Sequence, residues 1–272
     1  MQQGKSEPFR SVILAGERPG GSPLSQVFDV PASVMVPVAG TPCLTHVMRA
    51  ITDSKVADGG VICGPSADAV ASSEQLQALL EHPDYTWLEQ ATGPAASALS
   101  ALQKLGQFPA LLTAGDHALL TAEIIDDFCH QAVQHSDTGN YDLVIGFVPY
   151  ALVKATWPQS RRTVLKFSNG QFCGSNLFAI MNPSARMALE FWRQAEADRK
   201  HPWRIARRFG FIALLRYLFR RLTLEEALQA LSEAAGCRIG HVEVGYARAA
   251  VDVDSVEDQL LAEKILSETG HY

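Results

Sequence analysis

The 272-residue sequence predicts a doubly wound α/β fold, in which helices cover both faces of a mostly parallel sheet. Three observations predict it: short apolar runs that end at Gly or a polar turn, helical spacing between those runs, and a Gly-bearing loop after the first run. Alternating strands and helices are typical of βαβ units. Ligands of such sheets bind outside the carboxyl ends of the strands, so we expect the chemistry on loops that follow strands.

The first half of the chain alternates regularly. Its apolar runs are short enough for buried strands, and the segments between them repeat apolar residues at helical spacing, including one Ala-rich stretch. The expected order is strand 11–16, helix 43–51, strand 59–64, helices 72–80 and 93–105, strand 110–113, helix 121–135 and strand 142–148.

A different pattern begins near Pro149. The Asn169–Gly170 pair between two apolar runs is typical of a hairpin turn. The expected elements are strands 164–167 and 176–180, helices 184–199, 203–222 and 223–235, strand 241–245 and helix 255–266. We therefore expect a single domain over residues 1–272, in which 149–231 forms an inserted helical and hairpin region on the acceptor side.

Composition excludes several classes of protein. Hydrophobic residues make up 47% and charged residues 19%, which argues against disorder. The net charge of −6 argues against general nucleic-acid binding. The five cysteines are widely spaced and favour neither a disulfide framework nor a zinc site. The start of the chain lacks an apolar signal core and no stretch is apolar enough to span a bilayer, so we expect a cytoplasmic protein.

The loop after the first strand is a candidate phosphate site. Leu14, Ala15, Gly16 and Gly20 would offer backbone N–H groups to phosphate, and Arg18 would add positive charge. The loop matches neither the P-loop motif nor the dinucleotide-binding motif. A flexible surface turn is the alternative.

Two acidic positions are candidate magnesium ligands. Asp116 follows the expected strand 110–113, and Thr121 already provides a start for the next helix. Asp254 precedes Ser255, which can cap the last helix, so Asp254 is available for metal. Asp252 would lie on the same face of an extended segment and is the alternative partner of Asp116. Taken singly, each acid is equally consistent with a solvated loop residue.

A polar cluster near the expected hairpin is a candidate acceptor site. Arg162 and Lys166 supply positive charge for a phosphorylated substrate, Gly174 permits close approach, and Asn176 can bind hydroxyl groups. An exposed hairpin edge that uses lysine against unwanted strand pairing is the alternative.

The segment 199–221 contains eight Lys or Arg residues and no acid, interleaved with aromatic and aliphatic residues. Such a helix could make peripheral contact with an anionic membrane through residues 203–222, or contact a phosphate-bearing acceptor. A helix with a solvated basic face is the more common alternative.

Taken together, the motifs resemble the nucleoside triphosphate transferase superfamily, in particular the branch that includes molybdenum-cofactor guanylyltransferase. They occur in the expected order over most of the chain. The matching segments are 12–18 (VILAGER), 36–42 (VPVAGTP), Gly93–Pro94, 114–117 (AGDH), 174–178 (GSNLF) and 252–258 (DVDSVED).

The resemblance implies a Rossmann-like nucleotidyltransferase that uses Mg²⁺, a nucleoside triphosphate and a small phosphorylated acceptor. The loop 15–21 would hold the triphosphate, and Gly93 and Ser97 would approach the base. The metal would bind to Asp116 and Asp254. An acceptor phosphate would attack the α-phosphorus and release pyrophosphate, with positioning and charge neutralisation as the catalytic devices.

Two positions depart from the family pattern. The family usually has Leu-Ala-Gly-Gly where this chain has Glu17 after Gly16, and Ser33 stands where a lysine is common. Arg18 or Lys166 would have to replace the missing charge as catalytic residues. A catalytically impaired nucleotide-binding protein is therefore one alternative. A nucleotide-sugar glycosyltransferase is another, although Ala118 leaves Asp116 without a D-x-D partner. The base, the acceptor and the oligomeric state stay open.

Overall fold

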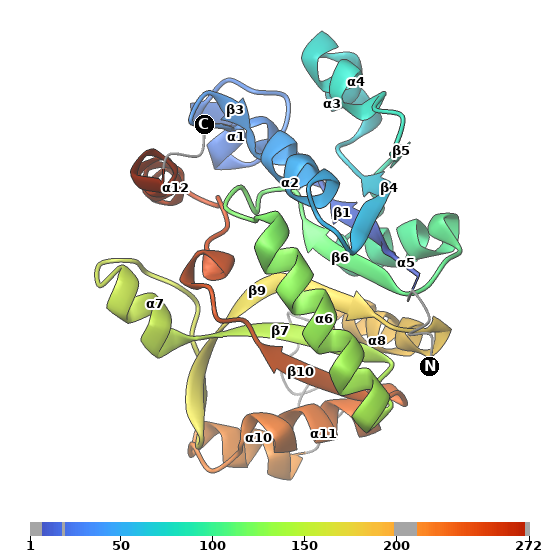
Figure 1. Cartoon of the computed structure of the whole chain (residues 1–272), viewed down its shortest axis with the longest axis vertical. Coiled ribbons are helices and arrows are strands. Elements are labelled where there is room, and N and C mark those ends of the chain that lie inside the picture. Colours follow the sequence, from blue (N-terminus) through green and yellow to red (C-terminus); the bar gives the residue numbers. More distant parts are fainter. Residues whose placement is uncertain (1–6, 18–19, 199–210, 270–272) are drawn as a thin grey trace.

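The computed structural model describes residues 7–17, 20–198 and 211–269. Within these residues the main sheet has eight strands in the order β10-β7-β9-β6-β1-β4-β5, with β8 paired to β9 (Figure 1). Its strands are β1 (Phe9–Leu14), β4 (Ala57–Cys63), β5 (Thr86–Leu88), β6 (Ala110–Ala114), β7 (Leu143–Pro149), β8 (Leu165–Phe167), β9 (Gly170–Ile180) and β10 (Ile239–Glu243). A small hairpin, β2 (Pro37–Val38) with β3 (Thr41–Pro42), lies outside it.

The sheet is mostly parallel, as the sequence predicts. Strand β1 is parallel to both β4 and β6, β4 is parallel to β5, and β7 is parallel to β10. Strand β9 is antiparallel to both of its main-sheet neighbours, β6 and β7. The expected segment 149–231 therefore supplies a central strand of the sheet as well as surface elements.

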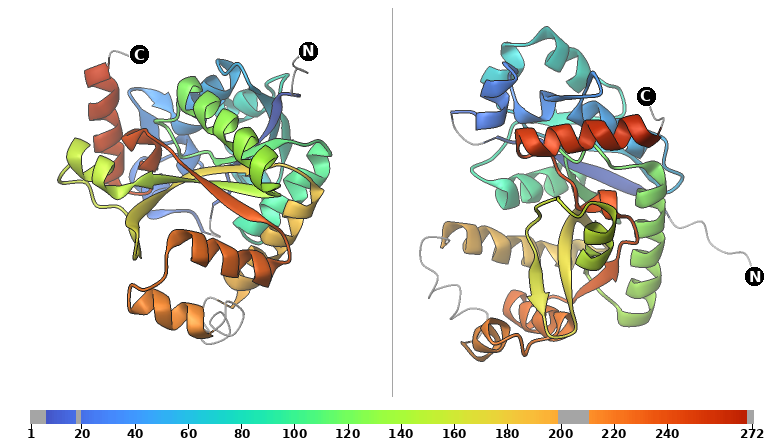
Figure 2. Two further views of the ribbon diagram at one scale, coloured as in Figure 1. Left: turned by 60° about the horizontal axis from the view of Figure 1, so that its bottom comes forward. Right: turned by 90° about the vertical axis from the view of Figure 1, so that its left-hand side faces the viewer.

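Helices cover both faces of the sheet (Figures 1 and 2). The helices longer than five residues are α2 (Cys43–Thr52), α4 (Glu74–Leu80), α5 (Pro94–Leu105), α6 (Ala122–Gly139), α7 (Tyr150–Thr156), α8 (Arg186–Ala197), α10 (Phe211–Leu218), α11 (Leu224–Ala235) and α12 (Val256–Thr269). Short helices are α1 (Pro23–Val27) and α3 (Ala67–Ala71), with 3₁₀ turns at Ser33–Met35, Pro183–Ala185 and Ala247–Ala250.

The core divides into two layers because side chains of a strand alternate between the two faces. On β1, Ile13 belongs to the cluster under α2 and α6, whereas Val12 belongs to the cluster under α5, α8 and α11. Both side chains are fully buried. A third apolar cluster joins α12 to the β2–β3 hairpin and to Val251 and Val253. Helix α12 is thereby attached to the segment that carries the candidate metal ligands.

The observed elements follow the expected order, and most boundaries agree within a few residues. Strand β5 and helix α7 were not expected, because three residues of strand and seven of helix give little periodicity. Residues 251–254 are not a strand of the sheet. Of the expected helix 203–222, only 211–222 falls within the described residues, and α10 ends at Leu218.

Candidate active site

Three loops meet at the carboxyl edge of the sheet, and we call this contact the loop junction. The Ala15 amide donates to the Cys63 carbonyl at 2.8 Å, and the Gly115 amide donates to the Leu14 carbonyl at 2.8 Å. Gly64 has a φ of +97°, and a Cβ at this position would lie 2.5 Å from the Gly16 nitrogen. The backbones after β1 and β4 therefore approach too closely for a side chain at residue 64.

Asp116 follows β6 at this junction. Its backbone carbonyl accepts a hydrogen bond from the Val253 amide at 3.1 Å, so the segment 252–254 lies directly beside it. The Thr121 hydroxyl accepts from the Ile124 amide and caps α6, which leaves the Asp116 side chain without a capping role. The structure thus brings together the two acidic segments that the sequence analysis singled out.

One oxygen of the Asp116 carboxyl lacks a hydrogen-bond partner within the part of the chain that the structure describes. Oδ1 is buried and makes no hydrogen bond to any described residue. The pKa of this carboxyl is raised to about 7, first by burial and then by the charges of Asp254 and Asp252. An unpartnered buried carboxylate oxygen that faces further negative charge is an environment that a cation would stabilise.

Asp252 and Asp254 differ in their surroundings. Asp252 is half-buried and accepts hydrogen bonds from Arg162 and Asn176. Asp254 is exposed and lies close enough to raise the pKa of the Asp116 carboxyl. The Ser255 hydroxyl accepts from the Asp258 amide at 3.2 Å, so it caps α12 as expected. Of the two alternatives, Asp254 is the carboxylate that faces solvent beside Asp116.

The donor set fits a magnesium ion that is shared with a substrate. Among the described residues, no group of three or more His, Cys, Asp or Glu side chains could hold a metal ion. Protein sites for Mg²⁺ commonly supply one or two carboxylates, and water and substrate phosphates complete the octahedron. Asp116 and Asp254 meet that requirement.

The loop after β1 contains an unexpected internal contact. The Glu17 carboxylate accepts from the Ser22 amide at 2.7 Å and from the Ser25 hydroxyl at 2.8 Å. Gln90 makes two hydrogen bonds to the Glu17 backbone. The Glu17 amide donates to Gln90 Oε1, and Gln90 Nε2 donates to the Glu17 carbonyl. Gly20 has a φ of +91°, as a glycine-dependent turn requires. The acid is therefore bonded within its own loop, while Arg18 lies outside the described residues.

The expected base-side residues occupy the start of α5. Gly93 precedes Pro94, the first residue of the helix. Ser97 is buried, and its hydroxyl accepts from the Ala91 amide at 3.0 Å. Ser97 thus shapes the turn between β5 and α5, and Gly93 stays a predicted contact.

The expected acceptor residues separate into two places. Arg162 and Asn176 both contact Asp252, beside the acidic segment. Gly174 is exposed on β9 opposite Phe147, with open space where a Cβ would be. Lys166 is exposed on β8 and pairs with Gln171 on β9. Gln171 lies five residues before Asn176, which corresponds to roughly 16 Å along an extended strand. The structure brings Arg162 to the acidic segment and leaves Lys166 toward the end of the hairpin.

Gln90 and Asp258 belong to the site region and were not predicted. Gln90 follows the three-residue strand β5, and no spacing marks a single glutamine in an irregular segment. The sequence pattern of a capping box predicts that Asp258 lies at the third position of the last helix and contacts Ser255. That pattern does not predict its contact with Arg162.

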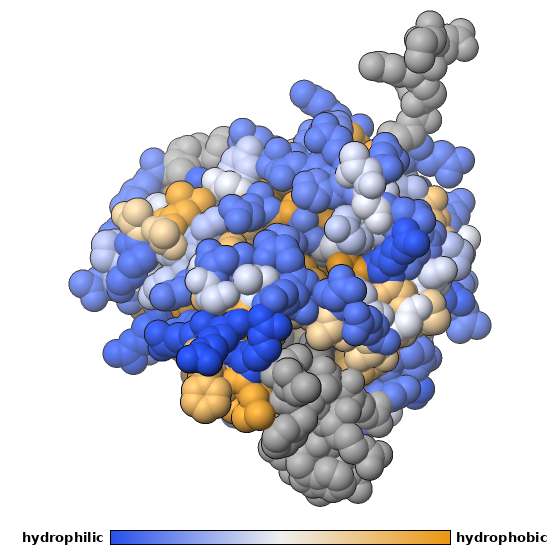
Figure 3. Space-filling model, turned by 90° about the horizontal axis from the view of Figure 1, so that it is seen from below, coloured by the Kyte–Doolittle hydropathy of each residue, from blue (hydrophilic) through white to orange (hydrophobic). Residues whose placement is uncertain are grey.

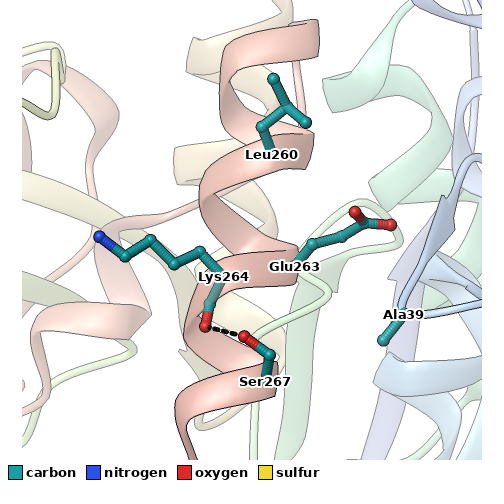
Figure 4. Close-up of a pocket in the computed structure, with 5 residues that line it drawn as sticks. All are labelled: Ala39, Leu260, Glu263, Lys264 and Ser267. Atoms are coloured by element: carbon teal, nitrogen blue, oxygen red, sulfur yellow. Dashed lines mark hydrogen bonds between the residues drawn. The ribbon is translucent and has the colours of Figure 1, made fainter.

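Two surface features lie apart from these residues. A hollow of about 440 Å³ lies between α12 and the β2–β3 turn, lined by Ala39, Leu260, Glu263, Lys264 and Ser267 (Figure 4). On α10 and directly after it, Leu215, Leu218 and Phe219 are exposed. Figure 3, which views the molecule from this end, shows hydrophobic and hydrophilic side chains side by side on the surface. Within the described residues, no helix combines the length and apolar character needed to cross a membrane.

The fold is that of an α/β protein of the Rossmann-like class. Residues 12–158, more than half of the chain, match the MobA-like NTP transferase domain. The chain therefore belongs to the MobA-like NTP transferase family, as its resemblance to the nucleoside triphosphate transferases predicts.

Solved structures agree with this assignment. A hypothetical transferase from Thermus thermophilus is 26% identical, with a TM-score of 0.73 over 93% of this chain and 100% of that chain. CMP:2-keto-3-deoxy-manno-octonic acid synthetase complexed with CTP is 10% identical (TM-score 0.58; 97% and 100% covered). The 4-diphosphocytidyl-2C-methyl-D-erythritol synthase of Anaerococcus prevotii DSM 20548 is 12% identical (TM-score 0.56; 96% of both chains). The last two show similarity of fold.

A curated relative matches over a shorter stretch. The bifunctional protein GlmU of Allorhizobium ampelinum is 32% identical over 90 residues. That stretch is 33% of this chain and 20% of GlmU, so the chain spans only a fifth of the length of that protein.

Proposed function

We propose that the protein is a Mg²⁺-dependent nucleotidyltransferase that moves a nucleoside monophosphate from a triphosphate to a phosphorylated small molecule. The observation that carries the proposal is the position of Asp116. Its unpartnered carboxylate oxygen lies where the loops after β1 and β6 meet the segment Asp252–Asp254. A metal-bound triphosphate requires carboxylates beside a backbone that can accommodate phosphate, and this junction supplies both.

The chain's own residues would mainly position the reactants. Asp116 and Asp254 would hold the metal, which when bound would neutralise charge on the phosphates. Backbone amides of Gly16 and Gly20 would face the triphosphate, whereas the Ala15 amide is already bonded to the Cys63 carbonyl. Gly93 would lie toward the base, while the buried Ser97 hydroxyl is bonded to the Ala91 amide. In-line attack then forms one P–O bond at the α-phosphorus while the bond to the β-phosphate oxygen breaks and pyrophosphate leaves.

The acceptor would enter from the β8–β9 side. Gly174 is exposed there and leaves open space, and Lys166 is an exposed cation on the same hairpin. An accessible cation favours an anionic acceptor, which motivates the phosphorylated class. Asn176 would orient hydroxyl groups of the acceptor while its amide nitrogen contacts Asp252.

Pyrophosphate release tests the proposal directly. The protein is incubated with MgCl₂, each of the four ribonucleoside triphosphates and pools of phosphorylated sugars, alcohols and cofactor precursors. CTP is the first choice, because two structural neighbours are named for CTP or for a cytidyl product. We expect release with one triphosphate, dependent on acceptor and abolished by EDTA. No release with any pair, including a crude metabolite extract, would count against it.

Calorimetric titration with each triphosphate distinguishes the transferase from a catalytically impaired nucleotide-binding protein, the alternative suggested by Glu17 and Ser33. Tight, Mg²⁺-dependent binding without turnover would indicate a nucleotide-binding protein that lacks catalysis. Binding and turnover together support the transferase.

A further inference from the structure

Arg162 is a buried cation held between two carboxylates. Its side chain is 7% exposed. Nη1 donates to Asp252 Oδ1 at 3.1 Å, Nη2 donates to Asp258 Oδ1, and Nε donates to Ser160 Oγ at 3.1 Å. All three guanidinium nitrogens thus bond to oxygens of the protein itself. A guanidinium committed in this way has little capacity left for a substrate.

The two carboxylates flank the candidate metal ligand. Asp252 precedes Asp254 by two residues and also accepts from Asn176 Nδ2 at 3.3 Å, which ties it to β9. Asp258 lies in the first turn of α12 and accepts from the Ser255 hydroxyl at 2.6 Å. Arg162 therefore links the residues on both sides of Asp254. We call these contacts of Arg162, Asp252, Asp258 and Asn176 the Arg162 cluster.

The same contacts distinguish Asp252 from Asp254 electrostatically. Both carboxylates lie near Asp116, since both raise the pKa of its carboxyl. The Arg162 guanidinium compensates the charge of Asp252 and donates to its Oδ1, while Asn176 Nδ2 donates to its Oδ2. Asp254, two residues further along the chain, is exposed to solvent. The cluster thus fixes Asp252 to Arg162 and Asn176 and leaves Asp254 as the solvent-exposed acid of the segment.

We propose that Arg162 is a positioning residue for the metal site and does not bind the acceptor. Because it bonds to both Asp252 and Asp258, Arg162 holds the Val253 backbone against Asp116 and keeps Asp254 near the Asp116 carboxyl. This inference rests on the proposed function for its catalytic meaning, but the position of the segment can be tested without ligands. It replaces the expectation that Arg162 contacts the acceptor phosphate.

The first test measures that position directly. Hydrogen exchange of the Val253 amide, which bonds to the Asp116 carbonyl, is compared in wild type, Arg162→Lys and Asp258→Asn. Lysine keeps the charge but has one compact ammonium, so it cannot replace the fork between two carboxylates. We expect exchange at Val253 to be at least tenfold faster in both variants, with little change in the core strands.

The matched control is Arg216→Lys. Arg216 also bonds to a carboxylate, that of Glu226, but the side chains are 43% and 41% exposed on α10 and α11. We expect wild-type exchange at Val253 in this variant. Unchanged exchange in both Arg162→Lys and Asp258→Asn would overturn the proposal.

The second test uses nucleotide binding and separates positioning from general stability. CTP, GTP, ATP and UTP are titrated by calorimetry in MgCl₂ and in EDTA. We expect Arg162→Lys and Asp258→Asn to weaken the Mg²⁺-dependent binding of the preferred triphosphate about tenfold. Binding in EDTA should stay within twofold of wild type, which a partly unfolded variant would not show.

The outcomes are distinguishable. Wild-type Mg²⁺–triphosphate affinity in Arg162→Lys, with a defect only in the dependence on acceptor concentration, would overturn the proposal in favour of acceptor binding. If wild type itself binds no triphosphate with Mg²⁺, the proposed function fails. The exchange experiment then still decides whether Arg162 holds the segment in place.

Discussion

The loop junction and the Arg162 cluster lie on either side of Asp116 and are held together in different ways. At the junction, backbone amides bond to backbone carbonyls, and Gly64 lies against the Gly16 backbone. In the Arg162 cluster, the contacts are between charged or polar side chains from distant parts of the sequence. Backbone contacts constrain only the size of a few residues, whereas side-chain contacts require particular chemical groups. The junction therefore leaves a general sequence signature, and the cluster does not.

Gly64→Ala should break the junction and has the largest expected effect on stability. The added Cβ would meet the Gly16 nitrogen at 2.5 Å and the Ala15 carbonyl carbon at 2.6 Å, and the φ of +97° is strained for alanine. We expect a loss of about 3 kcal/mol or more in the free energy of unfolding, measured with urea. The control is Gly106→Ala, at a φ of +66° with open space around it. It should cost about 1 kcal/mol, and equal losses in both variants would show that the close approach is unimportant.

Asp116→Asn tests the acid between the two regions. We expect pyrophosphate release to fall at least about 100-fold, because the proposed metal site would lose a charged ligand. In metal-free buffer the same variant should be more stable than wild type, since the raised pKa of this carboxyl means that its charged form is disfavoured in the folded state.

The pH dependence of that stabilisation has a definite sign. The unfolded carboxyl ionises near its ordinary pKa of 3.8 and the folded one near 7. The cost of the buried charge is absent below about pH 4, grows between pH 4 and 7, and is constant above. The difference in melting temperature between Asp116→Asn and wild type, measured in EDTA, should follow that course. A difference that does not change with pH would contradict it.

Glu17→Gln tests a side-chain contact in the loop after β1, and so extends the comparison between backbone and side-chain contacts. Its carboxylate accepts from the Ser22 amide and the Ser25 hydroxyl. We expect a stability loss of about 1 kcal/mol from weaker hydrogen bonds. Triphosphate binding should become about threefold tighter, because an anion beside the phosphates is removed. Calorimetry and thermal unfolding check both, with exposed Glu81→Gln as control; weaker triphosphate binding would show that the acid supports the nucleotide.

Arg216→Ala should have the smallest effect. The Arg216–Glu226 pair resembles the Arg162 contacts in chemistry, but it is solvent-exposed. Exposed pairs contribute little to stability because solvent screens them. We expect a change in urea unfolding within experimental error and unchanged pyrophosphate release. A larger loss would mean that this contact is as important to the fold as the buried cluster.

The sequence predicts the order of strands and helices because each apolar run is local. It also singles out Asp116 and the segment 252–254, since loops after parallel strands meet at one edge of the sheet. It does not predict that Arg162 bonds to residues 90 and 96 positions away, or that Glu17 turns into its own loop. Those contacts depend on side-chain directions that exist only after the sheet has formed. The roles of Lys166, Gly93 and Gly174 stay predictions.

Strand β9 has a consequence for how this protein can be divided. It lies between β6 and β7 and is antiparallel to both, although it follows the family-matched residues 12–158 in the chain. A fragment that stops at residue 158 would leave facing edges of β6 and β7 with unsatisfied amides and carbonyls in the middle of the molecule. The stretch that identifies the family therefore does not contain the whole sheet, and residues beyond it supply the strand that joins β6 to β7.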